Sequence, residues 1–242
     1  MYYPAIMRTT TPDPLAEKYY HISPYAWCGN NPVNRIDLDG MKIVSGNMTE
    51  EERKDYDELI EKLNENKYFK TLYTSLDKSE KEYKVSFGEI KNEGVRGYYS
   101  PDKDTDGGGN IVFARGQKLK DATAIEELFH AYQDENKTLN RPLFNIEFEA
   151  KAAKQLMYYG GYLNIDGMDE YQDLLLYKYG NRLAPYDVSS PSFLNEYMKA
   201  ANKFAIHNNQ KNIGNEKYKT YNAIFLPTTL MRLINLTYFD NK

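Results

Sequence analysis

The chain has 242 residues and a formal net charge of −4, and hydrophobic residues make up 41% of it, which is typical of a globular protein with one sizeable core. No basic cluster is dense enough for a phosphate-binding face, so no nucleic-acid partner is expected. The single cysteine, Cys28, excludes an internal disulfide framework and a cysteine-rich zinc site. Only three histidines are present, so carboxylates must complete any metal shell. The histidines are His21, His130 and His207.

Neither end of the sequence carries a membrane signal. The first eight residues lack the cationic segment and apolar run of a secretory signal peptide. The apolar stretch at residues 223–239 is interrupted by Pro227, Arg232 and Asn235, so no membrane span is expected. We therefore expect a cytoplasmic protein, or one that is secreted or delivered without a signal peptide of its own.

The first 41 residues are rich in turn-forming dipeptides, such as Ser23-Pro24 and Asn31-Pro32, and show no helical period. We expect an extended arm here, because its apolar content is too low for a core of its own. Residues 13–20 and 23–40 closely resemble the end of the Rhs repeat-associated core, in which a β-repeat shell is followed by a variable C-terminal domain, often a toxin. The resemblance implies that residues 1–41 end this core and that residues 42–242 form the effector domain of a bacterial polymorphic toxin. It also implies an immunity protein as a partner.

After residue 42 the pattern predicts helices followed by short strands. Thr49-Glu50-Glu51-Glu52 is a capping-box sequence, in which the hydroxyl of Thr49 and the carboxylate of Glu52 each accept a free amide. Helices are predicted at residues 50–66, 68–76, 145–159, 170–179, 190–207 and 228–238. Strands are predicted at residues 83–87, 95–99 and 110–115.

A further helix is predicted at residues 122–134. One of its faces is apolar, and Glu126, Glu127 and His130 lie on the opposite side together with Gln133 and Asp134. Glu126 and His130 are four residues apart, so their side chains leave the helix in the same direction. A helical His-Glu-x-x-His motif uses this spacing to bind zinc and to hold a general base beside it. Here Glu126 stands at the first position; a polar stripe of this kind is also typical of a solvated helix face.

The octapeptide at residues 126–133, Glu-Glu-Leu-Phe-His-Ala-Tyr-Gln, resembles the active-site helix of zincin metallopeptidases. Residues 145–150 resemble the downstream glutamate helix of the gluzincin branch, in which a Glu followed three residues later by a small residue is the third ligand. This pattern favours Glu147 over Glu149. The resemblance implies an α+β, zincin-like fold that is mostly helical, with a small, mainly antiparallel sheet before the active-site helix. It also implies that the last strand, residues 111–115, borders the cleft and pairs with an extended substrate.

The resemblance further implies a metal-dependent peptidase with a protein or peptide substrate. Zn²⁺ would be held by Glu126, His130 and Glu147, and Glu127 would take a proton from the attacking water. His207 is a candidate for oxyanion stabilisation. A carboxylate at position 126 shifts metal preference towards Mn²⁺, and a histidine there would be expected to raise zinc affinity. Two alternatives remain open: a catalytically inactive zincin-like module that acts by binding without metal, and an Rhs toxin of different chemistry.

Overall fold

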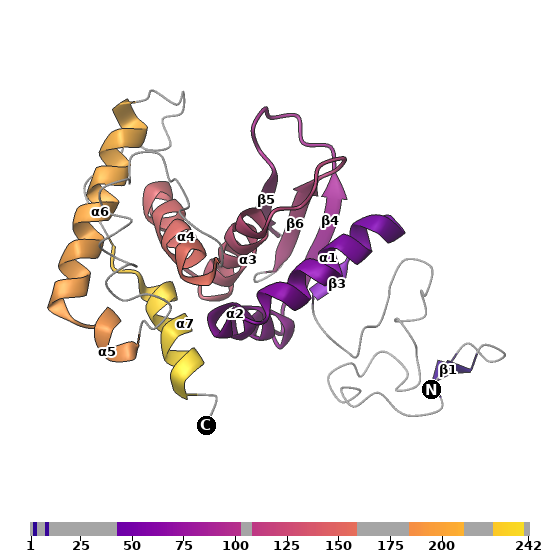
Figure 1. Cartoon of the computed structure of the whole chain (residues 1–242), viewed down its shortest axis with the longest axis horizontal. Helices are drawn as coiled ribbons and strands as arrows, with labels where there is room; N and C mark the ends of the chain where they lie inside the picture. Colours follow the sequence, from indigo (N-terminus) through magenta and orange to yellow (C-terminus); the bar gives the residue numbers. More distant parts are fainter. Residues whose placement is uncertain are drawn as a thin grey trace.

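The computed structural model describes residues 2–3, 8–9, 43–102, 108–158, 184–210 and 225–239 (Figure 1). Of the arm predicted for residues 1–41, it describes an antiparallel pairing between β1 (Tyr2–Tyr3) and β2 (Arg8–Thr9). The helix predicted at residues 170–179 lies outside the described residues. The domain boundary placed at residue 42 therefore stays a prediction.

A four-stranded mixed sheet with the order β3-β4-β6-β5 supports the helices that follow it. Its strands are β3 (Ile43–Ser45), β4 (Tyr83–Gly88), β5 (Gly97–Pro101) and β6 (Gly109–Ala114). β3 pairs with β4 and β4 pairs with β6 in parallel, whereas β5 and β6 are antiparallel. The α+β class is confirmed, but the prediction of a mainly antiparallel sheet is wrong. Alternating apolar and polar residues predict a strand without fixing the direction of its neighbour.

The strand order also corrects the predicted edge of the sheet. β6, the last strand in sequence, lies between β4 and β5, and its residues Ile111 and Phe113 are fully buried. β5 forms the edge on this side, because β6 pairs between β5 and β4, and β3 forms the opposite edge. The strand at the sheet edge beside the helix predicted at residues 122–134 is therefore β5 and not residues 111–115.

Two helices separate β3 from β4: α1 (Glu50–Leu63) and α2 (Lys67–Asp77). The predicted capping box is present, since Thr49 Oγ1 accepts the Glu52 N–H at 3.1 Å and Glu52 Oε2 accepts the Thr49 N–H at 2.8 Å. The two helices form the crossover that a parallel β3–β4 pair requires. Their apolar side chains enter the same core as the buried face of the sheet.

Two helices that carry the candidate site residues follow the sheet: α3 (Asp121–Glu135) and α4 (Leu143–Met157). α3 packs against β5, β6 and α2 on one side and against α4 on the other (Figure 1). Ile125, Leu128 and Phe129 of α3 are fully buried, as the predicted apolar face requires. The polar face of α3 is therefore turned partly towards α4 and is not simply a solvated surface.

Three further helices complete the described chain: α5 (Pro185–Val188), α6 (Pro191–Gln210) and α7 (Thr228–Phe239). α6 covers the outer side of α4, where Phe148 packs edge-on against Tyr197 with ring centroids 4.9 Å apart. α7 packs against α2 and α4. Among the helices of the described ranges, none combines the length and the apolar character that crossing a membrane demands.

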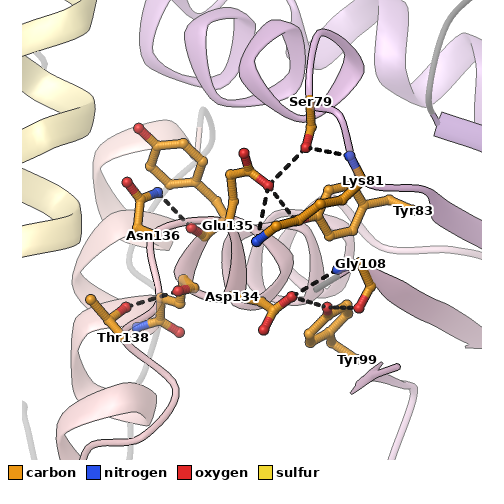
Figure 2. A network of polar contacts seen from close by, with 11 residues as sticks. Ser79, Lys81, Tyr83, Tyr99, Gly108, Asp134, Glu135, Asn136 and Thr138 are labelled. Atoms are coloured by element: carbon orange, nitrogen blue, oxygen red, sulfur yellow. Dashed lines mark hydrogen bonds and ion pairs between the residues drawn. The ribbon is translucent and has the colours of Figure 1, made fainter. Parts of the chain in front are cut away.

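The C-terminal end of α3 is tied to the sheet by two acidic residues, Asp134 and Glu135 (Figure 2). Acids are unfavourable at this end of a helix because the exposed carbonyl groups carry partial negative charge. Donors from the sheet and its loops compensate. They are Ser79 Oγ and Tyr83 OH for Glu135, each at 2.8 Å, and Tyr99 OH at 3.0 Å and Gly108 N–H at 3.1 Å for Asp134. These contacts fix α3 against both β4 and the edge strand.

Candidate metal centre

Three potential ligands from two helices meet at one point. Glu126 and His130 come from α3 and Glu147 from α4, and one ligand atom of each lies within 4.8 Å of the other two. His130 Nε2 is 3.9 Å from Glu147 Oε1, and these side chains are only 12% and 25% exposed. Zinc–ligand distances of about 2.0–2.2 Å place tetrahedral donors about 3.4 Å apart. Rotamer adjustments of about 1 Å would therefore close the three atoms around an ion.

Glu149, the alternative to Glu147 in the sequence, points away from His130. It is almost fully buried, and its Oε1 accepts the backbone N–H groups of Thr229 and Leu230 at 2.9 Å each. These amides belong to the first turn of α7, where helical N–H groups lack partners of their own. Burial raises the pKa of Glu149, although the N–H donors act in the opposite direction. Glu149 thus joins α4 to α7, and Glu147 is the one of the two that approaches His130.

Two lysines that sequence reasoning missed hold the carboxylate of Glu126. Lys151 Nζ is 2.6 Å from Glu126 Oε1, and Lys154 Nζ donates to Glu126 Oε2. Burial alone would raise the pKa of Glu126, but the two ammonium groups outweigh it and lower that pKa to about 2. Glu147, Lys151 and Lys154 follow the i, i+4, i+7 spacing of one helix face. That spacing was the available signal, although it could not show that this face meets α3.

Glu127 lies beside this cluster and faces the edge of the sheet. Burial raises the pKa of its carboxyl group to about 7; the charges of Glu126 and Glu147 act in the same sense, while His130 and a hydrogen bond from the Tyr99 backbone N–H oppose them. A carboxyl group with a pKa near neutrality can both take up and release a proton at neutral pH. The geometry is therefore compatible with the role predicted for Glu127.

The outer side of β5 is directed at the site. The hydrogen bonds from Ala114 N–H to Arg96 O and from Asp102 N–H to Gly108 O show that even-numbered residues of β5 pair with β6. The backbone groups of Gly97 and Tyr99 therefore point away from β6, and the Tyr99 N–H donates to Glu127 of α3. A Cβ added to Gly97 would lie 3.0 Å from Thr123 Cγ2 and 3.2 Å from Glu127 Cγ. The absence of a side chain at Gly97 permits this close approach of strand and helix.

Gln133 is the third residue whose role sequence reasoning missed. It was assigned to the polar face of the helix, yet it is fully buried, and its Oε1 is 2.8 Å from His130 Nδ1. Its i+3 spacing from His130 was a usable signal. His207, the candidate for oxyanion stabilisation, lies in α6, and its side chain is outside the part of the chain that the structure describes.

Comparisons of the chain with protein-family models, with curated proteins and with solved structures found no match. Neither the Rhs resemblance of residues 1–41 nor the zincin resemblance of the two site helices is tested by them. What the geometry defines is a group of one imidazole and two carboxylates that could hold a divalent cation, with a third carboxyl group next to it.

Proposed function

We propose that residues 42–242 are a metal-dependent peptidase and that they act as the effector domain of an Rhs-type toxin. The observation that carries the proposal is the convergence of Glu126, His130 and Glu147 beside Glu127. Oxygen and imidazole nitrogen donors suit Zn²⁺, and the second carboxylate also admits Mn²⁺. The Rhs assignment rests on the resemblance of residues 1–41.

The residues of the chain divide the chemistry among them. A divalent cation held by the three ligands supplies Lewis acidity towards water and towards a carbonyl oxygen. Glu127 is the general base that accepts the proton of the attacking water and passes it to the leaving amine. The Tyr99 N–H orients the Glu127 carboxylate from the edge strand.

Within the described residues no strand pairs with the outer edge of β5, and this supports a peptide as the substrate. An extended peptide can add to an exposed sheet edge through main-chain hydrogen bonds, and such pairing is independent of sequence. The outward-facing Tyr99 N–H donates to Glu127, so a peptide paired with the other outward-facing groups of β5 would pass the proposed metal position. The backbone of Pro101 also faces away from β6, so its missing N–H removes no hydrogen bond from the sheet.

One observation favours a second function, a catalytically inactive module that acts by binding. Lys151 and Lys154 already neutralise Glu126, so the cluster does not require a cation for charge balance. In this case the zincin-like arrangement would persist as a scaffold and the edge of β5 would bind a partner without cleaving it.

Metal content and cleavage separate the two functions. The full chain is purified without chelator, as wild type and as the variants His130→Ala, Glu147→Gln and Glu61→Gln; the last replaces an exposed glutamate on α1 and is the matched control. We expect about one zinc or manganese ion per chain, and cleavage of a peptide library, in wild type and Glu61→Gln, with both lost in the site variants. Equal metal content in all four proteins would overturn the proposed site. A fold that is intact but free of metal and activity would establish the binding module instead.

A further inference from the structure

Gln133 is a polar side chain in a fully buried position between α3 and α4. Its amide has three neighbours: Oε1 lies 2.8 Å from His130 Nδ1, and Nε2 lies 3.1 Å from Ile146 O and 3.2 Å from Glu149 Oε2. A buried amide has to satisfy both its donor and its acceptor ends inside the protein. The identity of these neighbours therefore decides which way the amide points.

Only one orientation of Gln133 is consistent with them. The Ile146 carbonyl and the Glu149 carboxylate are acceptors, so the NH₂ group must face them. The oxygen of Gln133 then faces His130 Nδ1 and can only accept. A neutral imidazole carries its proton on one nitrogen, so the proton sits on Nδ1 and the lone pair is on Nε2.

The Glu149 carboxylate that Gln133 contacts is itself held at the start of α7. Glu149 Oε1 accepts two backbone N–H groups, from Thr229 and Leu230, and these amides cannot reverse their direction. With Oε1 taken by these donors, Glu149 presents Oε2 to Gln133, and the Ile146 carbonyl, which can only accept, keeps the NH₂ group of Gln133 on that side. Hydrogen bonds run in one direction from His130 through Gln133 to Glu149, and the α7 amides donate to the same carboxylate.

We infer that Gln133 is a positioning residue that holds His130 in its Nδ1–H form, with Glu149 and the first turn of α7 fixing Gln133 in turn. The Nε2 lone pair is thereby kept free on the side of Glu147 Oε1, 3.9 Å away. Without Gln133, the negative charge of Glu147 would attract the single imidazole proton to Nε2, and that nitrogen could no longer bind a cation. The use of this lone pair for a metal rests on the proposed function, whereas the proton position itself does not.

Nitrogen-15 NMR of the imidazole rings reports the proton position directly. The chelator-treated full chain is measured at about pH 9, where an ordinary imidazole is neutral, and the His130 signals are assigned by their loss in His130→Ala. We expect the Nδ1–H form in wild type and a shift to the Nε2–H form in Gln133→Met, which removes both ends of the amide at similar volume. The control Glu61→Gln, an exposed substitution on α1, should keep the Nδ1–H form.

Zinc affinity provides the second readout. Loss of a hydrogen-bond partner of a metal-bound histidine typically lowers metal affinity about 10–100-fold, so we expect that loss in Gln133→Met and none in Glu61→Gln. An Nε2–H form in wild type, or an unchanged Nδ1–H form in Gln133→Met, would overturn the inference whatever the metal result. If the proton moves as expected but wild type binds no metal, the inference stands and the proposed peptidase fails. If Gln133→Met does not fold, an Nε2–H form in wild type still overturns the inference.

Discussion

Replacing Glu126 with histidine restores the sequence of a His-Glu-x-x-His helix, and by sequence alone this change should increase zinc affinity. The structure predicts the opposite for the single variant. In Glu126→His, Lys151 and Lys154 lose the carboxylate that they share, and two ammonium groups are left beside a neutral ligand. Only the triple variant, with Lys151→Met and Lys154→Met added, should bind zinc more tightly than wild type.

The distances give the size of the effect. Lys151 Nζ is 2.6 Å from a Glu126 oxygen, so a cation bound at this position would lie about 5 Å from the ammonium groups. At an effective dielectric constant of about 20, each unit of charge on the ion is repelled by about 3 kcal/mol per ammonium group. Movement of the more exposed Lys151 into solvent relieves part of this, whereas the Lys154 side chain is only 11% exposed. A net loss of about 3 kcal/mol corresponds to about hundredfold weaker zinc binding in the single variant than in the triple variant.

Calorimetric titration of zinc into chelator-stripped protein measures these affinities, and urea unfolding measures stability. The single variant should also be less stable by about 3 kcal/mol, because removal of one partner leaves a buried charge uncompensated. The control carries Lys151→Met and Lys154→Met with Glu126 retained, which separates the effect of the lysines from that of the new histidine. Tighter zinc binding by Glu126→His alone, equal to that of the triple variant, would show that the lysines do not act on the ligand position.

Three other predictions follow from the same geometry. Glu127→Gln should reduce peptide cleavage by about 10²–10⁴-fold while metal content measured by mass spectrometry stays at the wild-type value; a matching loss of metal would make Glu127 a ligand. Gly97→Ala should lower the free energy of unfolding by about 1–3 kcal/mol, because its Cβ would lie 3.0 Å from Thr123, whereas Gly88→Ala, whose nearest neighbour is 3.5 Å away, should be neutral in the same denaturation assay. In metal-free protein the pKa of Glu126 is lowered to about 2, so the stability that its carboxylate contributes is present above pH 4.5 and is lost as pH falls towards 2. The pKa of Glu127 is raised to about 7, so the free energy of unfolding falls as pH rises from 4.5 to 7. In urea unfolding, Glu127→Gln should remove only this second decline.

Spacing along single helices made part of the site predictable. Glu126 and His130 share a face because they are four residues apart. The preference for Glu147 over Glu149 came from the resemblance to the gluzincin pattern Glu-x-x-small. The structure brings the first three together and turns Glu149 to α7. The helix positions around them were also predictable, since the capping box before α1 and the apolar stripe of α3 are local signals.

The features that sequence reasoning missed depend on how separate elements meet. The order of β5 and β6 is set by sheet pairing and not by their local patterns, so the wrong strand was expected at the edge. Gln133 reads as a solvated residue until α4 covers it. Lys151 and Lys154 read as ordinary surface charges until their face of α4 is placed against Glu126.

The lysines also give a physical reason for the unusual carboxylate at position 126. A carboxylate offers about four lone-pair directions, and the two ammonium groups occupy one on each oxygen, so Glu126 can still reach a cation without losing them. The charges of Glu126 and Glu147 are then cancelled by those of Lys151 and Lys154, and the ion gains less electrostatic energy than two free carboxylates would provide. Glu126, Lys151 and Lys154 therefore depend on one another for charge balance. A histidine in place of the glutamate fits this helix pair only when the lysines are replaced as well.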